Sequence, residues 1–249
     1  ADLASSDRAI FTTDDARAVT GSSAPAVDLL IAGLIAKKWL IRLNRGTYLI
    51  VPMSAGHEAE YSEDWFVVAR ALIEPADYYL SHYTALEIHE MTSNPVLTIY
   101  ISTPVRRIEK RLGGATYRFI SARPENMWGI REVWATPTQR VRVSDLERTI
   151  IDCLDKPHYA GGIIEVAKAL KTGSLDYNQL SNYALKIDNF AVVRRLGYLC
   201  EGMGIPLNLP LPPSKKYLLL DPTMPAKGKN DPKWRLVINN DTVLPESLE

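Results

Sequence analysis

The chain has 249 residues, of which 46% are hydrophobic and 23% are charged, and this composition excludes an intrinsically disordered polypeptide. Its 29 basic and 29 acidic residues cancel, so no overall field draws the molecule to nucleic acid, and any such binding must come from local patches. A chain of this length suits a small domain followed by a larger one.

The only two cysteines, Cys153 and Cys200, lie inside apolar helical patterns, which excludes a disulfide framework and fits a reducing compartment. No apolar run reaches the roughly 18 residues of a membrane-spanning helix, and no charged-plus-apolar leader precedes the first predicted helix. We therefore expect a cytoplasmic protein that makes no membrane contact.

Residues 10–51 predict two short helices and a hairpin. Thr12 followed three residues later by Asp15 indicates a capping box, in which each residue satisfies a backbone N–H group of the first turn. Gly21 supplies the stop, because glycine adopts the left-handed conformation in which helices end. The first helix is therefore expected over about residues 13–20.

The second helix is expected to end near Lys37 and Lys38, cations that suit the negative end of the helix dipole. Ser22 or Ser23 can cap its start, and Pro25 falls in the first turn, where its missing N–H group is tolerated. An apolar stripe should bury against the first helix, and its members are Val27, Leu30, Ile31 and Leu34.

Two strands, residues 39–43 and 47–51, are predicted around a turn of Asn44, Arg45 and Gly46. Helix, turn, helix and hairpin in this order are typical of a winged helix-turn-helix, and between residues 31 and 50 every charged side chain is basic. Early in the second helix no Arg, Asn or Gln is present for bidentate base contacts, so the cations should set position more than read sequence. The predicted DNA-contacting residues are Ser22, Ser23, Ala26, Lys37, Lys38, Arg42, Asn44 and Arg45.

The pattern predicts an α+β fold, in which the winged helix-turn-helix of residues 1–53 precedes a larger domain of residues 54–249. Residues 52–61 are polar and aperiodic and are expected to form the linker. Helices are expected from Ser62 and Ser81, and a capping box of Ser144 with Glu147 should open another. The larger domain should hold a small antiparallel sheet (96–102, 115–121, 131–135, 139–144), a helical bundle (161–171, 177–187, 190–202) and two edge strands (217–221, 234–240).

Three segments, residues 78–92, 141–157 and 189–201, together with the winged helix, resemble the AbiEi antitoxin family over roughly residues 10–202. The resemblance implies a bacterial or archaeal type IV toxin-antitoxin regulator that represses its own operon. Its implied partners are double-stranded operator DNA, carrying repeats, and a nucleotidyltransferase-like toxin that it counteracts directly or indirectly. The resemblance carries over no catalytic residue and no cofactor.

A second basic stretch surrounds the turn at Gly113 and Gly114, with Glu109 as its one acid. It can contact phosphates, face the toxin, or be a solvated hairpin, and the sequence leaves the three open. The basic pair Arg194 and Arg195, beside an apolar stripe, predicts a solvated face. The residues of the second basic stretch are Arg106, Arg107, Lys110, Arg111 and Arg118.

Two other functions stay open. A metal-dependent nuclease would dock through the wing and use carboxylates of the larger domain, and a protein-interaction adaptor would use the helical pair to bind protein. The carboxylates Asp145, Glu147, Asp152 and Asp155 spread over more than one helix face, so a structural role is expected for them. His82 and His89 are seven residues apart and lack the usual i, i+4 spacing of metal ligands, so no metal site is predicted.

Overall fold

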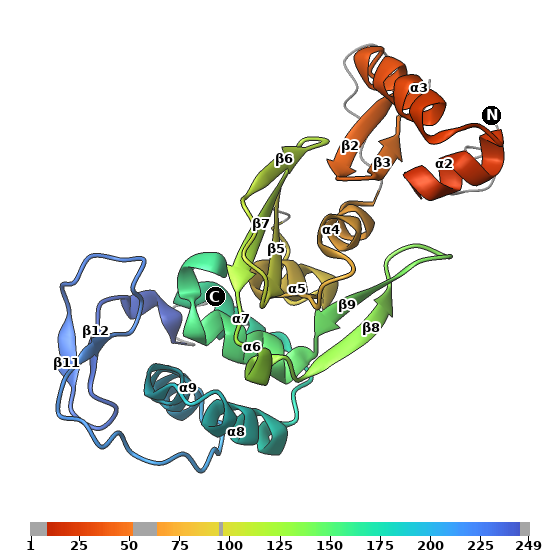
Figure 1. Cartoon of the computed structure of the whole chain (residues 1–249). Helices are drawn as coiled ribbons and strands as arrows, with labels where there is room; N and C mark the ends of the chain where they lie inside the picture. Colours follow the sequence, from red (N-terminus) through yellow and green to blue (C-terminus); the bar gives the residue numbers. More distant parts are fainter. Residues whose placement is uncertain (1–8, 52–63, 95–96, 245–249) are drawn as a thin grey trace.

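The computed structural model describes residues 9–51, 64–94 and 97–244, so the predicted linker and its neighbour Ser62 lie outside the described residues. The N-terminal unit is the predicted order of two helices and a hairpin, with one further strand at its start (Figure 1). Its strands form an antiparallel sheet in the order β1-β3-β2. The elements are β1 (Ile10–Thr12), α2 (Thr13–Thr20), α3 (Ala24–Ala36), β2 (Leu40–Asn44) and β3 (Thr47–Ile50).

The start and end of α2 follow the predicted chemistry. The Thr12 hydroxyl accepts a hydrogen bond from the Asp15 N–H group at 3.2 Å, and the Asp15 carboxylate accepts one from the Thr12 N–H group at 2.7 Å. Gly21 has a φ of 66°, and its N–H group donates to the Arg17 carbonyl. The capping box and the glycine stop are therefore confirmed.

The apolar stripe of α3 is only partly as predicted. Val27 and Ile31 are buried with Phe11, and Leu34 packs against the same cluster. Leu30, however, is 50% exposed, because α2 covers a narrower face of α3 than the spacing suggests.

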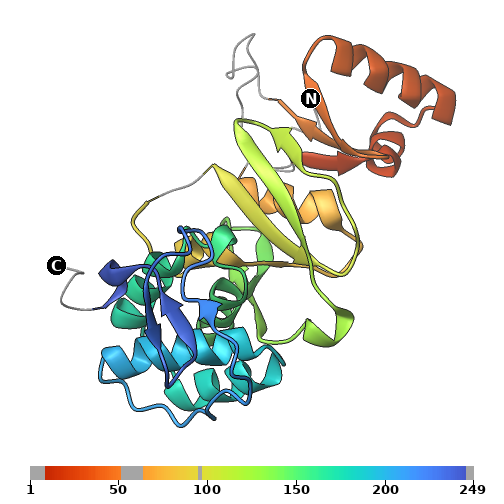
Figure 2. The same cartoon turned by 90° about the vertical axis from the view of Figure 1, so that its left-hand side faces the viewer.

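The N-terminal sheet packs on both of its faces. Leu40 and Tyr48 contribute to the cluster beneath α2 and α3, whereas Leu43 and Leu49 belong to a second core shared with helix α4 (Trp65–Ile73). Burying apolar side chains on both faces holds the winged helix against the rest of the molecule. Figure 2 shows the resulting arrangement, with α2 and α3 at one end and the C-terminal strands at the other.

The central sheet has six strands in the order β6-β7-β5-β4-β9-β8. The prediction of an antiparallel sheet is corrected in two pairings, since β5 runs parallel to β7 and β4 runs parallel to β9. The two-residue strand β4, which the sequence does not reveal, lies between β5 and β9. The elements of this part are β4 (Tyr79–Leu80), α5 (His82–Ile88), β5 (Thr98–Thr103), β6 (Lys110–Leu112), β7 (Ala115–Ser121), η2 (Pro124–Asn126), β8 (Ile130–Trp134) and β9 (Arg140–Ser144).

A helical bundle follows the sheet and shares one core with the C-terminal strands. Trp234 lies against Gly197 of α9 so closely that a Cβ atom there would be 2.2 Å from the indole ring. The indole N–H group donates to Glu201 at 2.6 Å, which fixes this packing. The elements are α6 (Leu146–Asp155), η3 (Pro157–Tyr159), α7 (Ile163–Thr172), α8 (Tyr177–Lys186), α9 (Phe190–Gly202), β10 (Leu218–Leu219), β11 (Lys229–Asp231), β12 (Leu236–Ile238) and η4 (Asp241–Val243).

Two local predictions in this part are wrong. Helix α6 is capped by Asp145, whose carboxylate accepts from the Arg148 N–H group at 2.7 Å, while Ser144 is buried and bonds to Thr149. Arg195, expected on a solvated face, is 7% exposed and donates to the carbonyl oxygens of Leu154, Leu219 and Leu220. The first error is local, because Asp145 caps the helix one residue later than predicted. The second arises from tertiary partners of Arg195, which no local pattern reveals.

Both cysteines are free and buried, as expected. In the part of the chain that the structure describes, no single helix is long and apolar enough to span a membrane. The bent pair α2 and α3 passes that test by length and composition only.

Candidate nucleic-acid interface

The start of α3, where a recognition helix approaches bases, is exposed and nearly uncharged. Ser22, Ser23 and Ala26 are all solvent-exposed, and the Ser23 side chain makes no capping hydrogen bond. Further along, the outer face of α3 presents Leu29, 77% exposed, and Leu30. Hydroxyl and methyl groups at this position can touch phosphates or thymine methyls, but bidentate base reading requires side chains that α3 lacks.

Lys37 and Lys38 are exposed at the other end of α3. Because each helical residue advances about 1.5 Å, the 13 residues of α3 separate these lysines from Ser23 by about 20 Å. Lys37 lies over the ring of Trp39 at 5.5 Å, an exposed cation–π contact. The two lysines therefore form a cationic end distinct from the serine end.

Arg42 and Arg45 line a hollow of about 510 Å³ between the hairpin and the two helices. Arg17, Asp14 and Asp28 line the same hollow, so its three cations face two carboxylates. The hairpin tip is held against α2, since the Thr13 N–H group donates to the Gly46 carbonyl at 2.9 Å. The hollow combines exposed arginines with a fixed backbone, which is suited to contacting a phosphate strand.

Asn44 points away from the hollow toward the larger part of the molecule. Its amide group donates to the carbonyl oxygens of Ala71 at 3.0 Å and Leu72 at 2.7 Å, at the end of α4. Its oxygen accepts from the Lys110 ammonium group at 3.3 Å, and Lys110 also donates to the Leu43 carbonyl. Asn44 therefore joins two parts of the fold, and the sequence, in which it is one residue of a predicted turn, does not predict this role.

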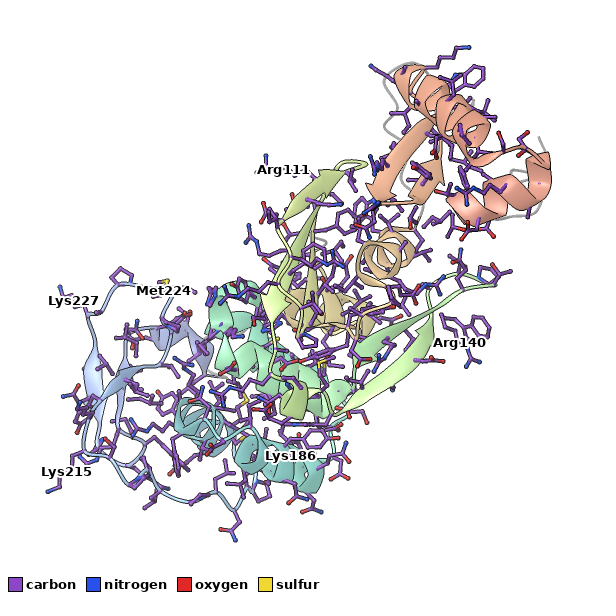
Figure 3. The ribbon with its side chains drawn as sticks, viewed as in Figure 1. Arg111, Arg140, Lys186, Lys215, Met224 and Lys227 are labelled. Atoms are coloured by element: carbon purple, nitrogen blue, oxygen red, sulfur yellow. The ribbon has the colours of Figure 1, made fainter. Side chains whose placement is uncertain are left out.

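The second basic stretch divides into three kinds of side chain. Lys110 is half-buried against the hairpin, Arg118 pairs with Glu109 at 2.7 Å, and the remaining arginines are exposed. The expected turn at Gly113 and Gly114 is present, since β6 and β7 pair antiparallel across it. Arg111, on β6, lies at the end of the sheet nearest β2 (Figure 3).

Burial is the main cause that lowers the pKa of Lys110, and repulsion by Arg107 and Arg42 adds to it. The hydrogen bonds of Lys110 to the Leu43 carbonyl and the Asn44 oxygen attach β6 to the hairpin. Lys110 therefore connects the hairpin and the second basic stretch. We call Arg42, Arg45, Arg106, Arg107 and Arg111, the exposed cations on the two sides of Lys110, the composite basic surface.

The carboxylates considered for a metal site have structural partners. Asp145 accepts from the Tyr183 hydroxyl at 3.0 Å, and Glu147 accepts from the Asp176 N–H group at 2.7 Å. Within the described ranges, no group of three or more His, Cys, Asp or Glu side chains is placed to hold a metal ion.

The two histidines of α5 serve separate contacts. His82 Nδ1 bonds to the Ser81 hydroxyl at 2.8 Å, and His89 Nε2 bonds to the Ser144 carbonyl at 2.6 Å. Burial lowers the pKa of both imidazoles, so both are neutral near pH 7.

Residues 1–51 match the model of a family described as transcriptional regulator, AbiEi antitoxin. The match is confined to the N-terminal unit, so this unit is similar to the N-terminal segment of the AbiEi antitoxin regulators. The match ends with β3, so the resemblance of the three later segments to this family stays a prediction.

The whole fold is similar to that of a crystal structure of protein RV2827C from Mycobacterium tuberculosis. The TM-score is 0.68 at 16% sequence identity, and the match covers 95% of this chain and 88% of that chain. None of the curated proteins matches this chain.

Proposed function

We propose that the protein is a cytoplasmic, non-catalytic DNA-binding repressor and antitoxin of the type IV kind. In this proposal residues 1–53 contact the operator, and residues 54–249 carry the antitoxin function. The observation that carries it is the fold of the family-matched segment as helix-turn-helix and hairpin, with exposed cations at Lys37, Lys38, Arg42 and Arg45.

The arrangement of charge supports phosphate-led binding. Exposed arginines on the hairpin continue onto the second basic stretch through Lys110, while α3 offers Ser22, Ser23 and Ala26 to the groove. Binding led by phosphate contacts is strongly salt-dependent, and base contacts add the preference between sequences. We therefore expect modest sequence preference and a steep salt dependence.

Fluorescence anisotropy with the duplex upstream of the protein's own gene, and with a random duplex of equal length, tests the repressor half. The own duplex should bind tighter, and the logarithm of affinity should fall linearly with the logarithm of salt. A matched control is Lys215→Ala with Lys227→Ala, since both lysines are exposed at the far end of the molecule (Figure 3). Equal affinity for the two duplexes would contradict the repressor proposal.

The antitoxin half is tested in cells by co-expression with the product of the gene adjacent to this one, which the proposal predicts to be a nucleotidyltransferase-like toxin. The full chain should restore growth. A triple variant shows whether the second basic stretch contacts the toxin or DNA, and its changes are Arg106→Ala, Arg107→Ala and Arg111→Ala. Loss of growth rescue with intact DNA affinity places that stretch against the toxin, and the reverse places it on DNA. Failure of the unaltered chain to rescue growth would remove the antitoxin half.

A protein-contact role for the helical pair is the second candidate, and one observation favours it. Val19, Leu29, Leu30 and Trp39 are between 47% and 77% exposed on the N-terminal unit, and exposed apolar side chains that gather in one region mark protein contacts. We test contact with a second copy of the chain, because the leucines on the outer face of α3 are uncharged and would not repel the same face of that copy. Leu29→Ser with Leu30→Ser should turn a dimer into a monomer in analytical ultracentrifugation; a monomeric parent chain would remove this candidate.

A further inference from the structure

The larger part of the molecule contains a polar pocket that none of the functions above uses. It has a volume of about 350 Å³ and lies where the ends of β5 and β7 meet helix α6 and the turn before α9. Small-molecule sites usually measure about 300–1,000 Å³, so the pocket is at the small end of that range. We call it the inner pocket.

Arg148 is the central cation of the inner pocket, and it is 2% exposed. Its guanidinium group donates to Asp152 at 2.9 Å and to the Tyr79 hydroxyl at 3.1 Å, and it lies 3.8 Å from the centre of the Trp128 ring. Its remaining nitrogen, Nη1, is buried without a hydrogen-bond partner among the described residues. A guanidinium group fixed by three contacts, with one donor left over, is prepared to bind an anion.

Two further cations line the same pocket. Arg123 is exposed at its rim, and the half-buried Lys156 donates to the Ser121 carbonyl at 3.3 Å. Lys156 and Arg148 are also among the charges that lower the pKa of the neighbouring His82, after burial, which is the largest cause. Three cations from α6, its end and the segment after β7 therefore converge on one small volume.

Hydrogen-bond acceptors lie opposite these donors. Asp152 Oδ2 is buried and has no described partner, while Asp155 accepts from Asn189 at 2.6 Å. Asp188 lines the pocket at the turn before α9. A ligand that satisfies both sides must carry an anionic group and, a few ångströms away, groups that donate hydrogen bonds.

Two residues that line the inner pocket have a left-handed backbone conformation. His82 and Asp188 have φ angles of 52° and 54°, a conformation that is uncommon for residues other than glycine. His82 is also buried, and its Nε2 atom has no described partner.

A purely structural role explains these features poorly. A buried ion pair such as Arg148 with Asp152 is often no more stabilising than apolar side chains of similar volume, and unpaired buried polar atoms cost free energy. Arg148 Nη1, Asp152 Oδ2 and His82 Nε2 all line one pocket or its wall, where a ligand could satisfy them together.

We propose that the inner pocket binds a small phosphate monoester that carries hydroxyl groups, such as a sugar phosphate or a mononucleotide. Arg148, Arg123 and Lys156 hold the phosphate, and Asp152, Asp155 and Asp188 accept hydrogen bonds from the hydroxyl groups. The proposal is independent of DNA binding, because the pocket shares no residue with the composite basic surface.

Isothermal titration calorimetry of the full chain tests this proposal with ribose 5-phosphate, inorganic phosphate, ribose and adenosine monophosphate. Ribose 5-phosphate should bind with a Kd of about 1 mM or lower, and more tightly than phosphate or ribose alone. Weaker binding of adenosine monophosphate would indicate a sugar phosphate as the ligand, and tighter binding would indicate a mononucleotide.

Variants connect the binding to the inner pocket. Arg123→Gln and Lys156→Gln should each weaken binding about tenfold or more, whereas Lys171→Gln, an exposed lysine of α7 outside the pocket, should leave it unchanged. These side chains are at the pocket rim, so the variants keep the fold even if the buried Arg148→Lys does not. No saturable binding of any probe, or equal binding by all four proteins, would overturn the proposal.

Discussion

The two ends of the molecule use side chains in opposite ways. The N-terminal unit exposes apolar side chains, with Leu29 at 77% and Leu30 at 50%, whereas the larger part buries charges, with Arg148 at 2% and Asp152 at 4%. Each arrangement costs free energy in an isolated fold, because apolar surface favours burial and charge favours water. The difference supports the roles proposed above, in which the N-terminal unit contacts another surface and the larger part holds a polar interior site.

The largest expected effect comes from breaking the buried ion pair. Asp152→Ala leaves the Arg148 guanidinium group buried without its carboxylate, and loss of one partner of such a pair costs about 3–5 kcal/mol. Urea unfolding should show this loss of stability. Leu211→Ala is the control, because truncating an exposed side chain changes the free energy of unfolding by about 0.5 kcal/mol or less. Similar effects of the two changes would contradict the comparison.

The free energy of unfolding should be nearly as sensitive to a change in the contact between α9 and the C-terminal strands. Gly197→Ala places a methyl group 2.2 Å from the Trp234 ring, which the buried packing cannot accommodate without movement. Overpacking of this kind costs about 1–3 kcal/mol. Thermal unfolding measures the loss, and Gly33→Ala, at an open position on α3, serves as the matched control that should not destabilise. A neutral Gly197→Ala would show that the C-terminal strands pack loosely.

The buried charge should also make stability depend on pH. Burial raises the pKa of Asp152 from 3.8 to about 6, although Arg148 acts against the shift. A raised folded pKa means that the folded state binds the proton more tightly, so the contribution of Asp152 to stability is complete below pH 3.8 and lost as pH rises through about 6. Unfolding at pH 4 to 7 should show this decline in the unaltered protein and not in Asp152→Asn. The same slope in both proteins would assign the decline to other groups.

The smallest expected effect concerns the contact between the hairpin and α4. Asn44→Ala removes the hydrogen bonds to Ala71 and Leu72, which should cost about 1 kcal/mol and loosen the winged helix from the larger part. Hydrogen exchange at the end of α4 should increase, while the capping box of α2 stays protected. Unchanged exchange at α4 would mean that apolar packing alone holds the two parts together.

Local chemistry explains why much of the N-terminal unit could be predicted. The residues of a capping box, a left-handed glycine and a hairpin turn act within a few positions of one another, so Thr12, Asp15 and Gly21 define α2 from the sequence alone. The same holds for α9, whose predicted range and observed range agree. Strands β5, β7 and β9 were found for a similar reason, since each is a long β-branched or aromatic run.

The remaining features depend on contacts between distant residues. Strand β4 has two residues, which are too few to show an alternating pattern in the sequence, and it forms through its pairing with β5 and β9. The inner pocket has one signal in the sequence, the oppositely charged i, i+4 pair Arg148 and Asp152 of α6, but the partners Tyr79 and Trp128 come from other segments. Neither the contacts of Asn44 with α4 nor the contact of Lys110 with the hairpin follows from the sequence, because each joins residues far apart in the chain.

One measurement tests most directly whether the composite basic surface contacts DNA as a single surface. Arg42→Ala, Arg107→Ala and their combination are compared with the unaltered chain in anisotropy titrations of the upstream duplex over a range of salt concentrations. If both arginines contact the same DNA, each change reduces the salt slope by about 1, and the double variant reduces it by about 2. A slope that changes with Arg42 but not with Arg107 would contradict a surface shared between the winged helix and the larger part.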